Sequence, residues 1–216
     1  MTNYAMDSNA TASQTALNMN SPASTSITWE AFQALDETAF RALLGPVVEH
    51  SPWVAQRAWS AHPFADHEQL YRAMAGVILA ASEGEQRALL CSHPELAGRE
   101  ARAGTMTADS QSEQGRLGLL ALDAPTVQRI ETLNSQYRER FGFPFIAALR
   151  LHATLASVLQ DFDERLRHDG AAERSEALRQ VCEVMRGRLN QAVSPPLPSV
   201  SPAAPPAVST LSGSSS

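Results

Sequence analysis

A histidine before a proline is the first side chain that could carry chemistry. His93 precedes Pro94 in the segment CSHPELAG. A residue before proline is pushed out of the helical region, so the helix that carries Leu89 and Leu90 is expected to end near Ser92. The imidazole would then stand at a helix end or in the loop beyond it. There it can face a cleft, titrate near neutrality and act as a general acid or base. The alternative is a surface histidine beside a helix stop.

A polar cluster follows in the segment DSQSEQ. Ser110 and Glu113 have the spacing of a capping box, so one interpretation is that they only begin a helix. In the other interpretation, Ser110, Glu113 and Gln114 lie on the first turn of that helix, where free amides and the positive end of the helix dipole attract anions. The residue types alone leave both interpretations open.

The segment FGFPFI offers backbone donors rather than charged side chains. Pro144 is typical of the first turn of a helix, and the sequence predicts one long helix over about 144–167. The amides of Phe145, Ile146 and Ala147 would then lack partners within the helix and could receive a carboxylate or carbonyl oxygen. The aromatic rings of the segment are also expected in the core, which is compatible with that role.

Two arginines, Arg186 and Arg188, flank Gly187 in the segment VMRGRLNQ. A glycine within a helix costs about 1 kcal/mol relative to alanine. A guanidinium at either position could bind a planar carboxylate or ureido group with paired donors. Whichever of the two faces outward is expected to be a solvated surface arginine.

Helices must position these groups, because apolar residues recur with a helical period almost throughout the chain. Helix starts are indicated at Asp66, at the capping box that begins with Ser82, and at Asp123. Gly142 is expected to end the helix that Asp123 begins, and a last helix is predicted over about 172–192. No pair of strands with a hairpin turn can be recognised. The predicted fold class is therefore all-α, a single-domain helical bundle of about seven to nine helices.

The two ends of the chain differ in composition from its middle. Residues 1–27 are rich in Ser, Thr, Asn and Ala, and residues 193–216 are rich in Pro, Ser and Ala. Both are predicted to be disordered, because they offer too little apolar surface to offset the entropy of the chain. One domain is expected between them, over residues 28–192.

The composition of the 216 residues narrows the classes of function. A formal net charge of -6 argues against a protein that binds nucleic acid by neutralising phosphates, but not against a small anionic substrate. The longest apolar run is interrupted by Arg150 and His152, so no membrane span is expected. Cys91 and Cys182 form neither a disulfide framework nor a set of metal ligands, and no metal or phosphate-loop motif can be recognised. These features favour a cytoplasmic protein.

Five segments together resemble one family. EHSPWVAQRAW, HPELAG, DSQSEQG, LNSQYRERFGFPFI and RGRL follow one another as in the 2-oxo-4-hydroxy-4-carboxy-5-ureidoimidazoline (OHCU) decarboxylases. The resemblance extends from about Trp29 to Leu189. A His-Pro pair alone would be unspecific, whereas five motifs in register are specific.

The resemblance implies a cofactor-independent, all-helical and usually homodimeric enzyme. Such an enzyme decarboxylates OHCU, an intermediate of urate breakdown, to (S)-allantoin. The peroxisomal address of animal members is missing, which favours a cytoplasmic location. The resemblance assigns catalysis to His93 and substrate binding to a further set: Pro94, Ser110, Glu113, Gln114, the amides of Phe145 and Ile146, and an arginine that is Arg188 or Arg186, with the following leucine favouring Arg188.

Two other functions are compatible with the sequence. A helical interaction module without catalysis would bind a partner helix in its apolar grooves, and His93, Glu113 and an arginine need not then converge. A lyase or hydrolase acting on another ureido compound would keep the same scaffold. Among the other histidines, His62 is the main competitor because it too precedes a proline, but it lacks a following Ser/Glu/Gln cluster.

Overall fold

The computed structural model describes residues 26–194, and this part of the chain is all-α. None of its helices is both long enough and apolar enough to cross a membrane. Ten α-helices and three short 3-10 helices follow one another: α1 (Trp29–Gln33), α2 (Glu37–Leu44), η1 (Gly45–Val47), α3 (Trp53–Ala58), η2 (Trp59–Ala61), α4 (His67–Leu79), α5 (Glu83–Cys91), α6 (Arg99–Ala103), α7 (Ala108–Arg116), α8 (Ala124–Phe141), η3 (Leu149–Leu151), α9 (Leu155–Arg165) and α10 (Gly170–Ala192). The number exceeds the expected seven to nine because α1 and α6 are single short turns that carry little periodicity.

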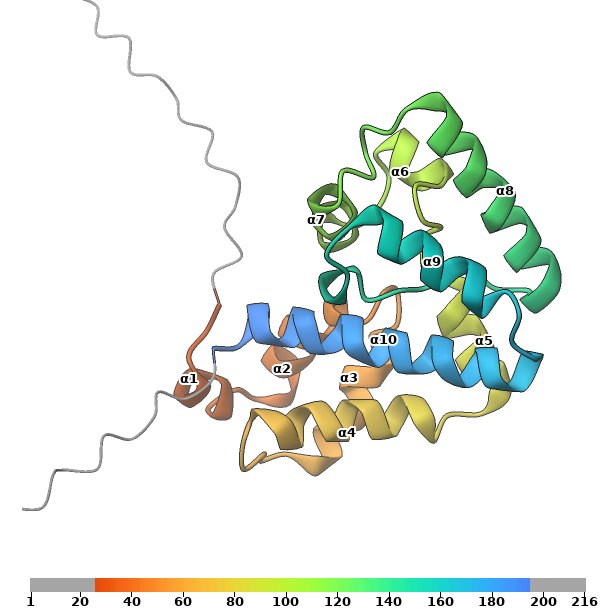
Figure 1. The fold of residues 1–216 in the computed structure, drawn as a ribbon. Coiled ribbons are helices and arrows are strands. Elements are labelled where there is room, and N and C mark those ends of the chain that lie inside the picture. Colours follow the sequence, from red (N-terminus) through yellow and green to blue (C-terminus); the bar gives the residue numbers. More distant parts are fainter. Residues whose placement is uncertain (1–25, 195–216) are drawn as a thin grey trace, which may run out of the picture.

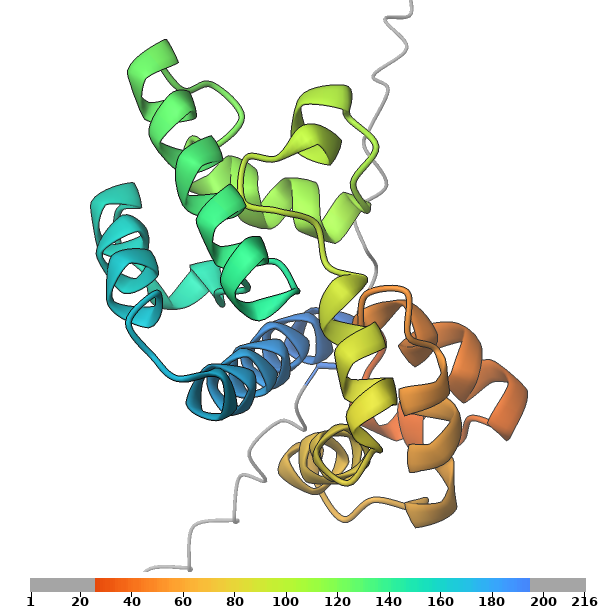
Figure 2. The ribbon, with the colours of Figure 1, turned by 90° about the vertical axis from the view of Figure 1, so that its right-hand side faces the viewer.

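The last helix, α10, is the centre of the fold. Figures 1 and 2 show it passing between two groups of helices, α1–α5 on one side and α6–α9 on the other. It contacts α2, α4 and α5 in the first group and α8 in the second. A residue near the end of α10 can therefore reach both groups.

Side-chain caps explain where the helices begin. The Asp66 carboxylate accepts a hydrogen bond from the amide of Gln69, and Asp123 caps α8 in the same way. The capping box of Ser82 and Glu85 is complete. These three predicted starts are confirmed, and each cap supplies acceptors for amides that lack partners within the helix.

Gly142 ends α8 as expected. Its φ of 75° lies in the left-handed region, which costs glycine little. A Cβ at this position would also collide with the guanidinium of Arg87. The chain thus turns sharply between α8 and the segment that follows.

Each side of α10 has its own aromatic cluster. On the first side the rings of Phe32, Phe40 and Phe64 lie 5.6 to 6.2 Å apart. On the second side Phe145 stacks on Phe162 at 3.9 Å and meets the edge of Tyr137 at 5.5 Å. The clusters belong to one continuous core. Burying such rings stabilises the fold by about 1.5–3 kcal/mol each. Both groups of helices are therefore packed firmly against α10.

The long helix expected over about 144–167 is wrong. Residues 143–148 are non-helical, η3 follows, and α9 begins only at Leu155. Five of those six residues are buried, so the segment has no solvated face of the kind an amphipathic helix needs. Side chains from neighbouring helices satisfy its backbone instead: Arg165 donates to the carbonyl of Ile146, and the amide of Ala148 donates to Gln180.

The described residues begin and end side by side. The amide of Ile27 donates to Ala192 at 3.1 Å, and the amide of Ser194 donates to Ile27 at 2.8 Å. The tails predicted for 1–27 and 193–216 lie, apart from these inner ends, outside the described residues. This contact fastens the end of α10, which carries the arginines, to the chain before α1.

Candidate active site

A cavity lies where α10 meets both groups of helices. It opens to solvent and is lined by both polar and apolar side chains, which suits a small ligand. Eight of the nine residues predicted for the site line it: His93, Pro94, Ser110, Glu113, Gln114, Phe145, Ile146 and Arg188. They come from the end of α5, from α7, from the 143–148 segment and from α10. The helical-module alternative did not require this convergence.

His93 lies two residues after the end of α5 at Cys91, as the proline behind it predicts. The side chain is buried, with 8% of the residue exposed, so the surface alternative is wrong. Nδ1 lies 2.9 Å from the carbonyl oxygen of Leu89. A carbonyl can only accept, so Nδ1 carries a proton and Nε2 of the neutral ring does not.

His93 does not titrate near neutrality as expected, because its imidazole is buried. Removal from water lowers the pKa of the imidazole to about 4, although the hydrogen bond to Leu89 and the charge of Glu49 act in the opposite direction. The ring is therefore neutral at physiological pH. Its unprotonated Nε2 is available to take a proton.

Arg188 joins the groups of the site. Its Nε and Nη2 each donate to one oxygen of Glu113 at 2.9 Å, a bidentate pair. Nη1 donates to Glu49 at 2.8 Å, and Nη2 also donates to Ser110 at 3.2 Å. Burial opposes the charge of this guanidinium, but the two carboxylates outweigh burial and raise its pKa.

Glu49 is a buried carboxylate that sequence reasoning missed. It accepts hydrogen bonds from Thr107 at 2.9 Å and Ser110 at 3.0 Å, besides that from Arg188. Burial raises its pKa, and these three donors more than reverse the effect, so the pKa lies below its usual value. A signal was present, because Glu49 is the one acidic residue in the stretch GPVVEHSPW and apolar neighbours imply a paired charge.

Helix α7 begins earlier than the capping-box interpretation requires. Thr107 is its N-cap, and Ser110 is the third residue of the helix. The hydroxyl of Ser110 is therefore not a cap and is free to bond Glu49 and Arg188. Neither interpretation from the sequence is right in detail, because Glu113 lies beyond the first turn. The expected cluster of side chains at the cavity is nevertheless present.

Gln114 connects α7 to the loop after His93. Its Oε1 accepts from the amide of Ala97 at 2.8 Å, and its Nε2 donates to the carbonyl of Glu95 at 3.3 Å. Ala97 has a φ of 45°, which is unfavourable for a residue with a Cβ. The hydrogen bond to Gln114 thus stabilises an unfavourable backbone conformation at Ala97, in the loop that follows Pro94.

Phe145 and Ile146 line the cavity from an extended segment rather than from a helix start. Within residues 26–194 no hydrogen-bond acceptor engages the amides of these two residues. Two donors beside a cavity are suited to a ligand carboxylate or carbonyl oxygen. The predicted role of the amides is therefore geometrically feasible, although the predicted helix is absent.

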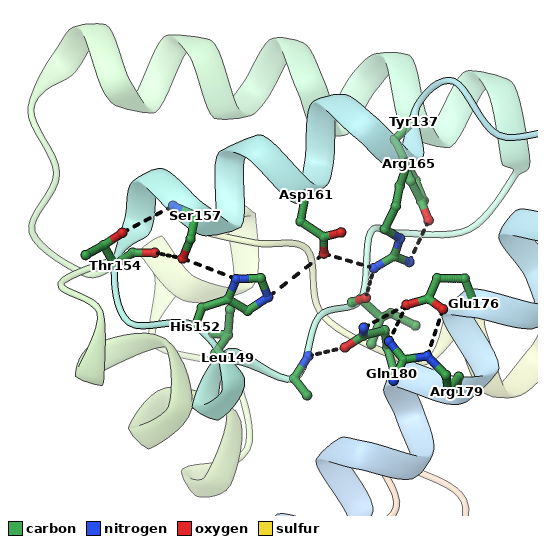
Figure 3. Close-up of polar contacts among 12 residues, drawn as sticks. Tyr137, Leu149, His152, Thr154, Ser157, Asp161, Arg165, Glu176, Arg179 and Gln180 are labelled. Atoms are coloured by element: carbon green, nitrogen blue, oxygen red, sulfur yellow. Dashed lines mark hydrogen bonds and ion pairs between the residues drawn. The ribbon is translucent and has the colours of Figure 1, made fainter.

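A buried polar network holds this segment in place (Figure 3). The guanidinium of Arg165 donates to Ile146 at 2.7 Å, bonds Glu173 at 2.6 Å and lies 4.5 Å from the ring centre of Phe145. Gln180 accepts from the amide of Ala148 at 2.8 Å. The two bonds anchor the segment on both sides of Ala147.

Arg186 does not reach the cavity. Two residues apart on a helix correspond to about 200° of rotation, so Arg186 and Arg188 point to opposite sides. Arg186 donates to Glu68 at 2.6 Å and stacks on Tyr71 at 3.5 Å from its ring centre. The preference for Arg188 is supported by this geometry, and Arg186 is wrong as a candidate.

His62 also lies elsewhere. Its ring stacks on Trp59 at 4.3 Å between centroids, within the aromatic cluster of α1–α4. Among residues 26–194, no group of three His, Cys, Asp or Glu side chains could hold a metal ion. His62 therefore does not share the cavity with Glu113 and Arg188.

These features define a class of protein. A small cavity with a neutral imidazole, a carboxylate-bound guanidinium and two amide donors is suited to an enzyme that binds a small anion and moves a proton. The family model for OHCU decarboxylase matches residues 33–190. The chain belongs to the OHCU decarboxylase family, which is a family of carboxy-lyases.

Individual relatives agree with this membership. A Mus musculus protein named 2-oxo-4-hydroxy-4-carboxy-5-ureidoimidazoline decarboxylase is 39% identical over 156 residues, which cover 72% of this chain and 87% of that protein. A Halalkalicoccus jeotgali protein of the same name is 36% identical over 171 residues, covering 79% and 94%.

Solved structures share the fold. The crystal structure of an (S)-allantoin synthase superposes with a TM-score of 0.62 at 27% identity, over 77% of this chain and 54% of that one. An OHCU decarboxylase solved in the presence of (S)-allantoin gives 0.55 at 16% identity, over 73% and 97%. At that identity the second structure bears on the fold alone.

Proposed function

We propose that this chain decarboxylates OHCU to (S)-allantoin, a step of urate degradation, with His93 as the residue that handles the proton. Family membership gives the reaction. The observation that supports this site is the convergence of His93, Glu113 and Arg188, from three separate elements, on one small cavity. None of these residues is near another in the sequence, so their meeting is a property of the fold.

The substrate can lose CO₂ without an external electron sink. Its carboxylate and a hydroxyl share a ring carbon that adjoins a C=N bond. When the C–C bond to the carboxylate breaks, the electron pair forms a new C=C bond, and the C=N pair moves to nitrogen, which takes a proton. The hydroxyl then loses its proton as a carbonyl forms, and the neighbouring carbon gains a proton. The protein must stabilise the moving charge and deliver that proton to one face.

The residues of the cavity suit these tasks. The amides of Phe145 and Ile146 and the guanidinium of Arg188 are donors for substrate oxygens, and Glu113 can accept from ureido or ring N–H groups. Neutral His93 can take the hydroxyl proton on Nε2. As an imidazolium it then has a proton to return to carbon. Ser110 and Gln114 also line the cavity and add polar groups that can contact the substrate.

The test is a stereochemical assay. Urate is converted to OHCU in situ with uricase and hydroxyisourate hydrolase, and circular dichroism follows optically active allantoin. Adding this protein is expected to accelerate formation of the (S) enantiomer. Racemic product at the spontaneous rate would exclude the function. Turnover of allantoate or allantoin in place of OHCU would instead identify an enzyme for another ureido compound.

We also propose that the enzyme is a cytoplasmic homodimer, as the family resemblance implies. The dimer is tested by sedimentation equilibrium across a tenfold range of protein concentration. A mass of twice 23.3 kDa is expected, and a monomer at all concentrations would exclude it. The location is tested by fractionation of the native cells with an antibody against the chain.

A further inference from the structure

Arg188 is already nearly saturated before any substrate binds. Of the five N–H groups of a guanidinium, four donate to protein atoms: two to Glu113, one to Glu49 and one to Ser110. A substrate carboxylate that needs the paired donors of Arg188 must therefore displace one of these partners.

The two carboxylates on Arg188 are not equivalent. The Glu49 side chain is 1% exposed and is held by two further hydroxyl donors, those of Thr107 and Ser110. The Glu113 side chain is 30% exposed, lines the cavity, and its only hydrogen-bond partner among residues 26–194 is Arg188. Glu113 can thus leave the guanidinium at little structural cost, whereas Glu49 cannot.

The balance of charge around Arg188 also indicates that Glu113 must move when the substrate binds. Two carboxylates face a single guanidinium, so the group carries excess negative charge before an anion enters. An incoming carboxylate is repelled by this excess charge. An anionic substrate can bind only if Glu113 moves away from the paired donors and yields them.

We infer that Glu49 is a positioning residue: it is the permanent counter-ion of Arg188, and by holding the guanidinium in place it frees Glu113 to leave and engage the substrate. This inference rests on the proposed function. Arg188 then exchanges the Glu113 carboxylate for that of the substrate, while its orientation stays fixed by Glu49. Without Glu49, Arg188 would retain Glu113 as its sole counter-ion, and Glu113 would be lost to the reaction.

The experiment compares Glu49→Gln with Glu49→Asp and with a matched control. Glu68→Gln is that control, because Glu68 pairs with Arg186 on the same helix but outside the cavity. Folding is checked by far-ultraviolet circular dichroism and thermal unfolding, and kcat and KM for OHCU are measured separately. For Glu49→Gln, kcat is expected to fall about 10- to 100-fold, the range typical of residues that orient binding groups. KM is expected to rise, because Glu113 stays on the paired donors of Arg188 that the substrate carboxylate needs.

The conservative variant adds a second readout. Glu49→Asp keeps the charge but withdraws the carboxylate by one methylene, so kcat is expected between those of Glu49→Gln and the wild type. Glu68→Gln is expected within twofold of the wild type. A folded Glu49→Gln variant with unchanged kcat would overturn the inference.

If Glu49→Gln fails to fold, Glu49→Asp decides the question, and full activity of that variant would overturn the inference. An inactive wild-type protein would refute the proposed function instead, so the two failures are distinguishable.

Discussion

The imidazole of His93 is tied to the carbonyl of Leu89, four residues earlier, at 2.9 Å. The helix that carries Leu89 ends two residues before His93, and the amide of His93 bonds Leu90 rather than Leu89. The Leu89 carbonyl instead accepts from the amide and hydroxyl of Ser92 and from Nδ1 of His93. The bond from Nδ1 fixes the tautomer that leaves Nε2 without a proton, so the end of a helix sets the state in which His93 could act as the proposed base.

Replacing this base should remove most of the activity. His93→Ala is expected to lower kcat by about 10²- to 10⁴-fold, because among residues 26–194 no other imidazole lines the cavity. The measurement is the circular dichroism assay of allantoin formation. His62→Gln is the matched control, since it too changes a histidine before a proline, and its kcat should stay within twofold. Near-normal turnover by His93→Ala would contradict the assignment.

The buried imidazole makes stability depend on pH. The folded-state pKa of about 4 lies below the usual 6.5, so the unfolded chain binds more protons between these values. The stabilisation from His93 is therefore complete above pH 6.5 and is lost as the pH falls toward 4. It amounts to about 3 kcal/mol at most.

Urea unfolding at several pH values between 4.5 and 7 measures this effect. The free energy of unfolding should rise with pH in the wild type and more weakly in His93→Gln, which lacks the titrating ring. Parallel curves for the two proteins would show that His93 is already solvated. Activity should follow the same titration, with kcat/KM falling only as the pH approaches 4.

Much of the fold was predictable because its signals are local. The caps at Asp66, Ser82 and Asp123 depend on side chains within three residues, and the ends of α5 and α8 depend on Pro94 and Gly142. The sequence could therefore locate His93 after a helix end. Motifs in register then indicated which polar residues share the cavity.

The errors come from contacts that are distant in sequence. The segment 143–148 is extended because Arg165 and Gln180 satisfy its backbone, and no local pattern reveals those bonds. The pKa of His93 depends on burial by several helices. Glu49 was missed because its partners lie 58 to 139 residues away. Only the fold brings such groups together.

The two arginines of α10 should respond differently to the same change. Arg188→Lys removes the bidentate bond to Glu113 and leaves Glu49 with a weaker partner. We expect kcat/KM to fall about 100-fold, with some loss of thermal stability because a buried carboxylate is less well compensated. Arg186→Lys, whose side chain lies against Tyr71, should keep kcat/KM within twofold. Equal losses in both variants would argue against a role for Arg188 at the substrate.

The anchoring of the 143–148 segment can be tested at Gln180. In Gln180→Leu the buried amide of Ala148 loses its acceptor, which costs about 1–3 kcal/mol of folding stability. The segment should then shift, and because Phe145 and Ile146 present their amides from it, KM for OHCU should rise several-fold while the His93 chemistry is retained. Gln160→Leu on α9 is the control, since that glutamine is exposed and its side chain bonds only Glu164 among residues 26–194. Thermal unfolding and steady-state kinetics give both readouts, and a destabilised variant with an unchanged KM would show that the segment does not need Gln180 to bind the substrate.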